Sequence, residues 1–240
     1  MRVDKEGLKS TQVATVSVNP VTAWRMLRDF VELREGNWWI QNGANSGVGR
    51  AAIQLGRLWG LRCIAVVRGR AGEDGERLKR ELEGLGATRV VTDEEVGEKG
   101  FKDKVMGWTN GGREKVILGL NCVGGDAAMA MAKVLSDGAH MVTYGAMSKS
   151  PMRVGASLLI FKDLRFSGFW VSRWADANPE QKMKTVEEIL QLIREGNFKD
   201  VPMVEVPWNW DTKKEELVQA VEGTLGGYRK GKGIFMFADT

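Results

Sequence analysis

Hydrophobic positions along the chain follow two different spacings. Between residues 48 and 59, apolar side chains recur every three or four positions, as in a helix with one buried face. On either side, residues 38–41 and 63–67 are short runs rich in Trp, Ile and Val, which are typical of buried strands. The alternation recurs in units of about 25–30 residues as far as residue 144. It predicts an α/β fold with a doubly wound parallel sheet.

This part of the chain is expected to hold six strands and three helices. We expect strands over residues 38–41, 63–67, 89–92, 115–123, 140–144 and 164–171. We expect helices over residues 48–59, 73–85 and 127–135. Gly60 marks the end of the first helix, because glycine adopts a left-handed backbone there without strain.

Both ends of the chain depart from this alternation. Residues 13–18 are β-prone, and a helix then begins with Asn19 as its N-cap and Pro20 as its first residue. This helix places Ala23 and Leu27 on one face, with Phe30 and Val31 beyond them. After residue 170 we expect a helix over 179–195, a strand over 204–206, a helix over 213–225 and a strand over 234–237. This tail lacks compact strand–helix units, so we interpret it as a piece of a second domain.

Composition excludes several classes of function. The net charge is only +4 over 240 residues, with both signs interspersed and no basic block, which argues against nucleic acid as a partner. No apolar run approaches the roughly 20 residues that span a bilayer, so we expect no membrane association. Cys63 and Cys122 lie in apolar runs and are expected to be buried thiols. With these two cysteines and His140, neither a Cys-rich nor a His-rich zinc site is possible, and His140 is expected to be structural.

The strongest chemical signal is a glycine turn between the first expected strand and its helix. Gly43, Gly47 and Gly49 occur in the order GANSGVG, a variant of the dinucleotide-binding fingerprint. Glycines allow the backbone to approach a pyrophosphate, whose charge is then stabilised by the N-terminus of the following helix. The position of the turn between a strand and an amphipathic helix predicts a bound dinucleotide.

The end of the second strand indicates which dinucleotide is bound. NAD-binding proteins usually carry an acidic residue there for the ribose 2′-hydroxyl, whereas this chain has Arg68 and Arg70. Arginines pair with a 2′-phosphate, so the sequence favours NADPH over NADH. Residues 121–125, 144–147 and 169–170 follow other strands at the same sheet edge, where they are either ligand contacts or packing groups.

Several of these segments together resemble the mitochondrial 2-enoyl thioester reductases, a zinc-free branch of the medium-chain dehydrogenase/reductase superfamily. The matching segments are residues 17–20, 22–23, 41–49, 67–70, 120–125, 143–148, 158–163 and 168–170. The resemblance implies a Rossmann domain over residues 19–169, with remnants of a GroES-like catalytic domain at residues 1–18 and 170–240. It also implies a homodimer and a mitochondrial location.

Carried over by position, the resemblance implies a set of NADPH contacts: Asn19, Asn45, Ser46, Gly47, Val48, Arg68, Arg70, Tyr144, Gly145, Ala146, Met147, Phe169, Trp170, Val171 and Lys232. It implies transfer of hydride from NADPH to C3 of a trans-2-enoyl thioester of coenzyme A or acyl carrier protein, with a tyrosine supplying a proton to C2. Two positions depart from the family pattern, Gly69 for an Asp and Ala146 for a second Gly.

No residue of this chain is predicted to be catalytic. The family's proton-donating tyrosine lies in a catalytic domain that precedes the cofactor domain, and neither Tyr144 nor Tyr228 corresponds to it. We therefore expect the chain to bind NADPH and to reduce enoyl thioesters weakly or not at all. Exposed Trp170, Trp208, Trp210 and the strand 234–237 would then favour aggregation or a partner. Two alternatives are a non-catalytic NADP-binding partner of full-length subunits and a quinone or enone reductase.

Overall fold

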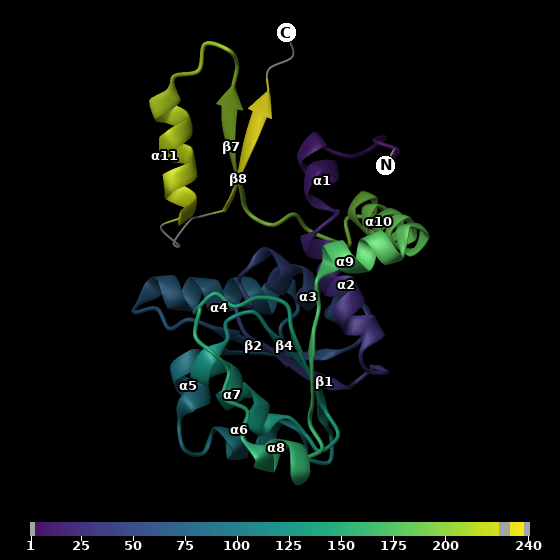
Figure 1. Cartoon of the computed structure of the whole chain (residues 1–240), viewed down its shortest axis with the longest axis vertical. Coiled ribbons are helices and arrows are strands. Elements are labelled where there is room, and N and C mark those ends of the chain that lie inside the picture. The colour runs from purple at the N-terminus through teal and green to yellow at the C-terminus, as the bar shows by residue number, and fades with distance from the viewer. Residues whose placement is uncertain (1–2, 226–230, 238–240) are drawn as a thin grey trace.

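A parallel six-stranded sheet forms the core of the larger body of the molecule (Figure 1). The computed structural model describes residues 3–225 and 231–237. All five pairs of neighbouring strands are parallel, in the order β3-β2-β1-β4-β5-β6. The strands are β1 (Trp38–Gln41), β2 (Arg62–Val67), β3 (Arg89–Thr92), β4 (Val116–Asn121), β5 (His140–Thr143) and β6 (Arg165–Gly168). The predicted α/β class and parallel sheet are confirmed.

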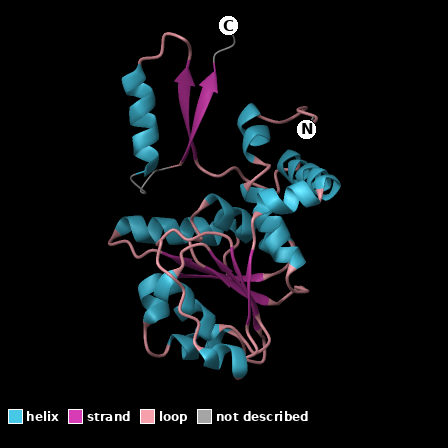
Figure 2. Cartoon of the chain, in the orientation of Figure 1, coloured by secondary structure: helices cyan, strands magenta, loops and turns pink. Residues whose placement is uncertain are grey.

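Helices cover both faces of this sheet, as Figure 2 shows. Two helices contribute most of the side chains that pack on one face, and three others cover the opposite face. The first set is α2 (Asn19–Asp29) and α3 (Gly47–Leu58), with α4 (Glu73–Leu85) beside them. The second set is α5 (Asp93–Gly97), α6 (Phe101–Trp108) and α7 (Gly125–Val134), with α8 (Ala156–Ile160) next to β6 in sequence.

The hydrophobic runs at β1 and β2 are continuous because both faces of these strands are buried. Trp39 packs among the side chains of α2 and α3, whereas Trp38 and Ile40 pack on the opposite face. In β2, Cys63 faces the first of these layers and Ile64 the second. Successive residues of a strand point to opposite faces, so a central strand needs apolar side chains at every position.

The structure differs from the predicted elements in several places. Residues 10–15 form the helix α1 (Ser10–Thr15), where we predicted β structure over 13–18. The Gln12 side chain accepts a hydrogen bond from the Lys9 N–H at 2.8 Å, and Val16 is buried against Val186 and Ile189, so packing overrides the β-propensity of Val and Thr. The strand expected to reach residue 171 ends at Gly168, because Trp170 is the N-cap of the helix α9 (Val171–Ala177).

A further difference is that the helices α5, α6, α8 and α9 were not predicted. Thr92 and Glu95 form a reciprocal capping box at the start of α5, with the Thr92 hydroxyl accepting from the Glu95 N–H and the Glu95 carboxylate accepting from the Thr92 N–H. The pattern Thr-x-x-Glu directly after a strand was a readable signal for this helix. One smaller shift concerns α2, which begins at Asn19 itself, with Val18 as its N-cap.

The last part of the chain forms a separate unit. We call β7 (Met203–Trp208), α11 (Lys214–Leu225) and β8 (Lys232–Phe237) the C-terminal unit, in which the two strands are parallel. Figure 1 shows it standing apart from the six-stranded sheet. The long helix α10 (Pro179–Arg194) instead packs on α2, with Val186, Ile189 and Leu190 buried against Val21. The division into residues 1–18, 19–169 and 170–240 stays a prediction.

No helix in the described ranges combines the length and apolar character needed to cross a membrane.

Candidate functional site

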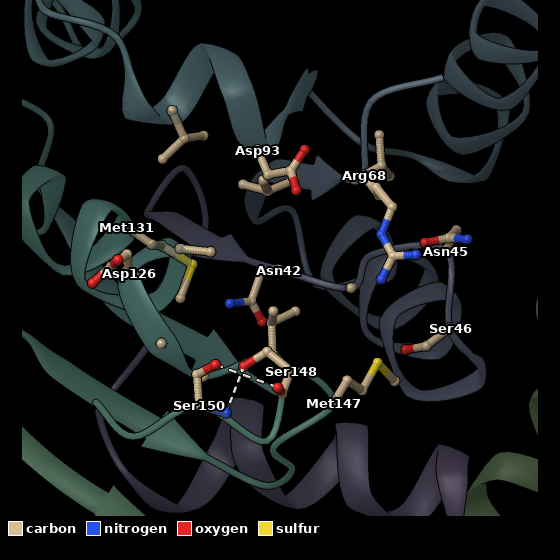
Figure 3. Close-up of a pocket in the computed structure, with 18 of the residues that line it drawn as sticks. Asn42, Asn45, Ser46, Arg68, Asp93, Asp126, Met131, Met147, Ser148 and Ser150 are labelled. Atoms are coloured by element: carbon tan, nitrogen blue, oxygen red, sulfur yellow. Dashed lines mark hydrogen bonds between the residues drawn. The ribbon is translucent and has the colours of Figure 1, made fainter. Parts of the chain in front are cut away.

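A cleft of about 910 Å³ opens at the carboxyl ends of the central strands. It is lined by residues from the ends of β1, β2, β3 and β4 and from the loop after β5. The chain leaves β1 toward β2 on one side, while β4 lies on the other side of β1, so the strand order reverses here. Ligands of doubly wound sheets bind at such a point. We call this the first cleft; Figure 3 shows its lining.

The glycines of the turn lie where no side chain fits. Gly43 has a φ of +59°, and a Cβ on it would collide with the Cys122 thiol. A Cβ on Gly47 would overlap the Asn19 amide, and one on Gly49 would lie 2.6 Å from the Ala44 carbonyl oxygen. The turn is therefore held tightly between α2, β4 and its own backbone, as a phosphate-binding turn requires.

The N-terminus of α3 points into the first cleft. Ser46 is the N-cap, and its hydroxyl accepts a hydrogen bond from the Gly49 N–H at 3.1 Å. The Asn45 and Ser46 side chains both line the cleft at this end of a twelve-residue helix. Unpaired N–H groups and the positive end of the helix dipole make this an anion-binding position.

Two buried asparagines hold the strand ends together. The Asn42 amide donates to the Asn121 side-chain oxygen at 2.8 Å, and the Asn42 oxygen accepts from the Cys122 N–H at 2.8 Å. The Asn121 oxygen also accepts from the Gly124 N–H at 3.1 Å, and its amide donates to the Thr143 hydroxyl at 3.1 Å. The turn after β1 is therefore fixed to the loops after β4 and β5, which together form the floor of the cleft.

Positive charge gathers where β2 ends. Arg68 and Arg70 are exposed and line the first cleft, and the intervening Gly69 N–H donates to Asp93 at 3.0 Å. Arg70 also lines a second cleft of about 1060 Å³, between α3, α4 and the start of the C-terminal unit. Lys232 lines this second cleft from β8. The structure thus brings cations from opposite ends of the sequence to one place.

The two clefts gather part of the predicted contact set. Asn45, Ser46, Arg68, Arg70 and Met147 line the first cleft, and Asn19, Asn45, Gly47, Arg70 and Lys232 line the second. The described linings of these two clefts do not include the remaining predicted contacts, which are Val48, Tyr144, Gly145, Ala146, Phe169, Trp170 and Val171.

Among these remaining residues, the side chains have different environments. Phe169 packs edge-to-face on Phe30, with ring centroids 5.9 Å apart, whereas Trp170 is exposed. The Tyr144 hydroxyl is buried beside the Cys122 thiol and the Ser46 hydroxyl, without a hydrogen bond of normal geometry. Burial and the neighbouring Cys122 raise the pKa of Tyr144 well above its usual value, so it stays protonated.

Sequence reasoning missed several cleft residues. Asp93, Asp126, Ser148 and Arg153 line the first cleft, and none was predicted as a ligand contact. Asp93 follows β3, so its place at the end of a parallel strand was a usable signal. The other three lie in helix α7 and in the loop after β5, whose distance from the turn only the fold decides.

The histidine and the cysteines lie in packed surroundings. His140 contacts the Phe30 carbonyl oxygen at 3.3 Å and the Ser167 hydroxyl at 2.7 Å. Burial lowers the pKa of His140 and raises the pKa of the Cys63 and Cys122 thiols. In the described ranges, no three His, Cys, Asp or Glu side chains are grouped as metal ligands.

Comparison with known proteins places this geometry in a family. The family model for zinc-binding dehydrogenases matches residues 47–194. The chain is 44% identical over 233 residues to the mitochondrial enoyl-[acyl-carrier-protein] reductase of Yarrowia lipolytica, a match covering 97% of this chain and 60% of that protein. This chain therefore spans about three fifths of the length of that relative.

Two solved structures show the same fold. The complex of Etr1p with NADP and crotonyl-CoA superimposes with a TM-score of 0.87 at 34% identity, covering 95% of this chain and 62% of that chain. The mitochondrial 2-enoyl thioester reductase Etr1p/Etr2p heterodimer from Candida tropicalis superimposes with a TM-score of 0.86 at 37% identity, covering 92% and 61%. The chain belongs to the zinc-binding dehydrogenase family, within the medium-chain dehydrogenase/reductase superfamily, and its relatives there are mitochondrial enoyl thioester reductases.

Proposed function

We propose that this chain forms the NADPH-binding part of a mitochondrial enoyl thioester reductase. The observation that carries the proposal is that an anion-binding helix N-terminus and two arginines at the end of β2 line the same cleft. The relatives support the substrate class, because one of them is a complex with NADP and crotonyl-CoA.

The residues present fit NADPH. Asn45, Ser46 and Gly47 would hold the pyrophosphate at the N-terminus of α3. Arg68 and Arg70 would pair with the 2′-phosphate, and Lys232 would add a third cation from the second cleft. NADPH, when bound, supplies a hydride to C3 of a trans-2-enoyl thioester. The protein's own groups bind and orient the cofactor, and no proton transfer is assigned to them.

Val48, in the first turn of α3, and the predicted contacts that follow β5 and β6 belong to the same proposal. Tyr144, Gly145, Ala146 and Met147 follow β5, next to β4 and its loop, and Phe169, Trp170 and Val171 follow β6. Both segments lie at the carboxyl edge of the sheet, on the far side of the turn from Arg68. We therefore assign them to the nicotinamide half of the cofactor. In this proposal residues 170–240 and 1–18 belong to the catalytic domain.

A second copy of the chain would form a homodimer. β6 is an edge strand of the six-stranded sheet, and Ile160 and Phe161, just before it, are 69% and 79% exposed. An open strand edge beside exposed apolar side chains is a surface that proteins normally cover. The heterodimer formed by two related reductases supports such pairing. The thioester carrier, coenzyme A or acyl carrier protein, is the other proposed partner.

A binding titration tests the cofactor assignment. We expect the wild-type chain to bind NADPH more tightly than NADH by at least about tenfold, since charge-assisted pairs with a phosphate contribute roughly 1.5–3 kcal/mol. Arg68→Ala combined with Arg70→Ala should remove most of this difference and leave NADH binding unchanged. Arg165→Ala, an exposed arginine on β6, is the matched control. Equal affinity of the wild type for the two cofactors would contradict the proposal.

An activity assay with three kinds of substrate distinguishes an enoyl thioester reductase from a quinone reductase. Loss of NADPH absorbance is followed after adding trans-2-enoyl-CoA, an enoyl-acyl carrier protein or a quinone. Oxidation of NADPH by the thioesters supports the reductase, and oxidation by the quinone alone would replace it with a quinone reductase. Binding of NADPH without turnover with any of these substrates is the result that we expect of this chain by itself, and it also fits a non-catalytic NADP-binding partner.

A further inference from the structure

The first cleft carries negative charge as well as positive charge. Arg68, Arg70 and Arg153 line it, but so do the carboxylates of Asp93 and Asp126. A dinucleotide with three phosphate groups cannot place a phosphate against a carboxylate without a large electrostatic cost. The carboxylates therefore mark where an uncharged part of the ligand lies.

Asp93 is held in place by the loop that carries the arginines. It is the first residue of α5, directly after β3, and one of its carboxylate oxygens accepts the Gly69 N–H at 3.0 Å. A carboxylate offers about four acceptor positions, so this single bond leaves capacity for a ligand donor. In Figure 3 the Asp93 carboxylate lies on the wall of the cleft between Met131 and Arg68.

The surroundings of Asp93 suit a flat aromatic base. Val66, Val96 and Met131 line the cleft on this side, which gives apolar walls near the carboxylate. Adenine has apolar faces, and its 6-amino group is a hydrogen-bond donor. In the adenosine 2′-phosphate part of NADPH, the phosphate and the 6-amino group lie at opposite ends. In Figure 3 the Arg68 guanidinium and the Asp93 carboxylate likewise lie apart along the cleft.

We propose that Asp93 selects adenine in this cleft by accepting a hydrogen bond from its 6-amino group. The inference rests on the proposed NADPH function and names a specificity-determining residue of that site. A base with a 6-oxo group in the same orientation sets an acceptor against the carboxylate, which costs the hydrogen bond and adds repulsion. The Gly69 N–H bond keeps the Asp93 side chain oriented before the cofactor arrives.

The test compares NADPH with its hypoxanthine analogue, deamino-NADPH, in direct binding titrations. The wild type should bind NADPH about tenfold more tightly than the analogue, the scale of one hydrogen bond to a charged acceptor. Asp93→Asn should bring the ratio of the two dissociation constants close to one, because an amide donates to a 6-oxo group. Its side-chain oxygen still accepts the Gly69 N–H, so the loop stays anchored.

Asp126→Asn is the matched control, since it removes the same charge from the same cleft. It should strengthen binding of both cofactors equally and leave their ratio unchanged. A wild-type ratio near one, or equal changes of the ratio in both variants, would overturn the role of Asp93 while NADPH binding stands. Binding of neither cofactor by the wild type would overturn the proposed function itself, and this inference with it.

Discussion

At the scale of single residues, the site depends on glycines at which a Cβ atom would overlap neighbouring atoms. Gly49 lies in the first turn of α3 with the Ala44 backbone where a Cβ would stand, whereas Gly84 in α4 has open space around the same position. Both are helical glycines with ordinary φ values. The same substitution at the two sites therefore separates lack of space from helix propensity.

Gly49→Ala should destabilise the protein by about 1–3 kcal/mol, the usual cost of overpacking, and weaken NADPH binding. Gly84→Ala should be neutral or stabilising by up to about 1 kcal/mol, because alanine is the better helix former. Urea unfolding measures the first effect and a cofactor titration the second. Equal behaviour of the two variants would show that the turn tolerates a side chain.

His140 makes stability depend on pH near neutrality. Burial lowers the pKa of His140 below its ordinary value, and the charge of Arg165 lowers it further, whereas the contact with the Phe30 carbonyl oxygen partly opposes this shift. The unfolded chain therefore binds a proton at a higher pH than the folded chain does. The stability that the neutral His140 ring contributes is fully present above about pH 6.5 and is lost as the pH falls toward the native pKa.

Wild type should therefore lose stability between pH 7.5 and pH 5.5 more steeply than His140→Gln does. The single histidine of this chain makes the comparison simple, because its imidazole signal in NMR reports the native pKa directly. A native pKa at or above about 6.5 would contradict the argument.

At the scale of elements, α8 and β6 form the surface proposed for dimerisation. Ile160→Glu with Phe161→Glu should turn a dimer into a monomer in sedimentation velocity, since two charges would be buried at an apolar contact. Trp210→Glu, at an exposed aromatic position in the turn after β7, is the control and should leave the dimer intact. Dissociation caused by the control alone would place the contact on the C-terminal unit.

The elements also show which signals act locally. The helices α3 and α4 were predicted to within one residue, because each has a periodic apolar face and a glycine just past or near its end. The short helices α1 and α5 were not predicted. They have five or six residues, too few for a period to be visible, and they persist through caps and tertiary contacts.

At the scale of the whole molecule, the two sheets differ in how they are supported. The six-stranded sheet is packed by helices on both faces, whereas β7 and β8 form a two-stranded sheet that contacts mainly α11. The ring centroids of Trp208 and Phe237 lie 4.2 Å apart, yet the Phe237 side chain remains exposed. A two-stranded sheet with an exposed apolar face is marginally stable in water.

Amide hydrogens of β7 and β8 should therefore exchange with solvent faster than those of β1, β2 and β4. Hydrogen exchange followed by mass spectrometry measures both sets in one sample. NADPH should slow exchange in the turn at residues 43–49 and leave the C-terminal unit nearly unchanged, apart from the segment around Lys232. Equal protection of the two sheets would mean that another surface covers the C-terminal unit.

The sequence by itself determined the class of fold and the kind of ligand. Short apolar runs specify strands that are buried on both faces, and apolar side chains at helical spacing specify the helices that cover them. Each of these patterns can be recognised within about ten residues. The glycine turn and the arginines at 68 and 70 are similarly local, because strand, turn and helix follow one another directly.

Only the tertiary structure decided which distant residues meet. The Asn42 side chain donates a hydrogen bond to Asn121, which lies 79 positions further along the chain. Lys232 and Arg70 both line the second cleft. The Asp93 carboxylate accepts a hydrogen bond from the Gly69 N–H. These contacts depend on the order of strands in the sheet, which no local period encodes. That order places the carboxyl ends of β1, β2, β3 and β4 at one edge, and the site consists of what those ends carry.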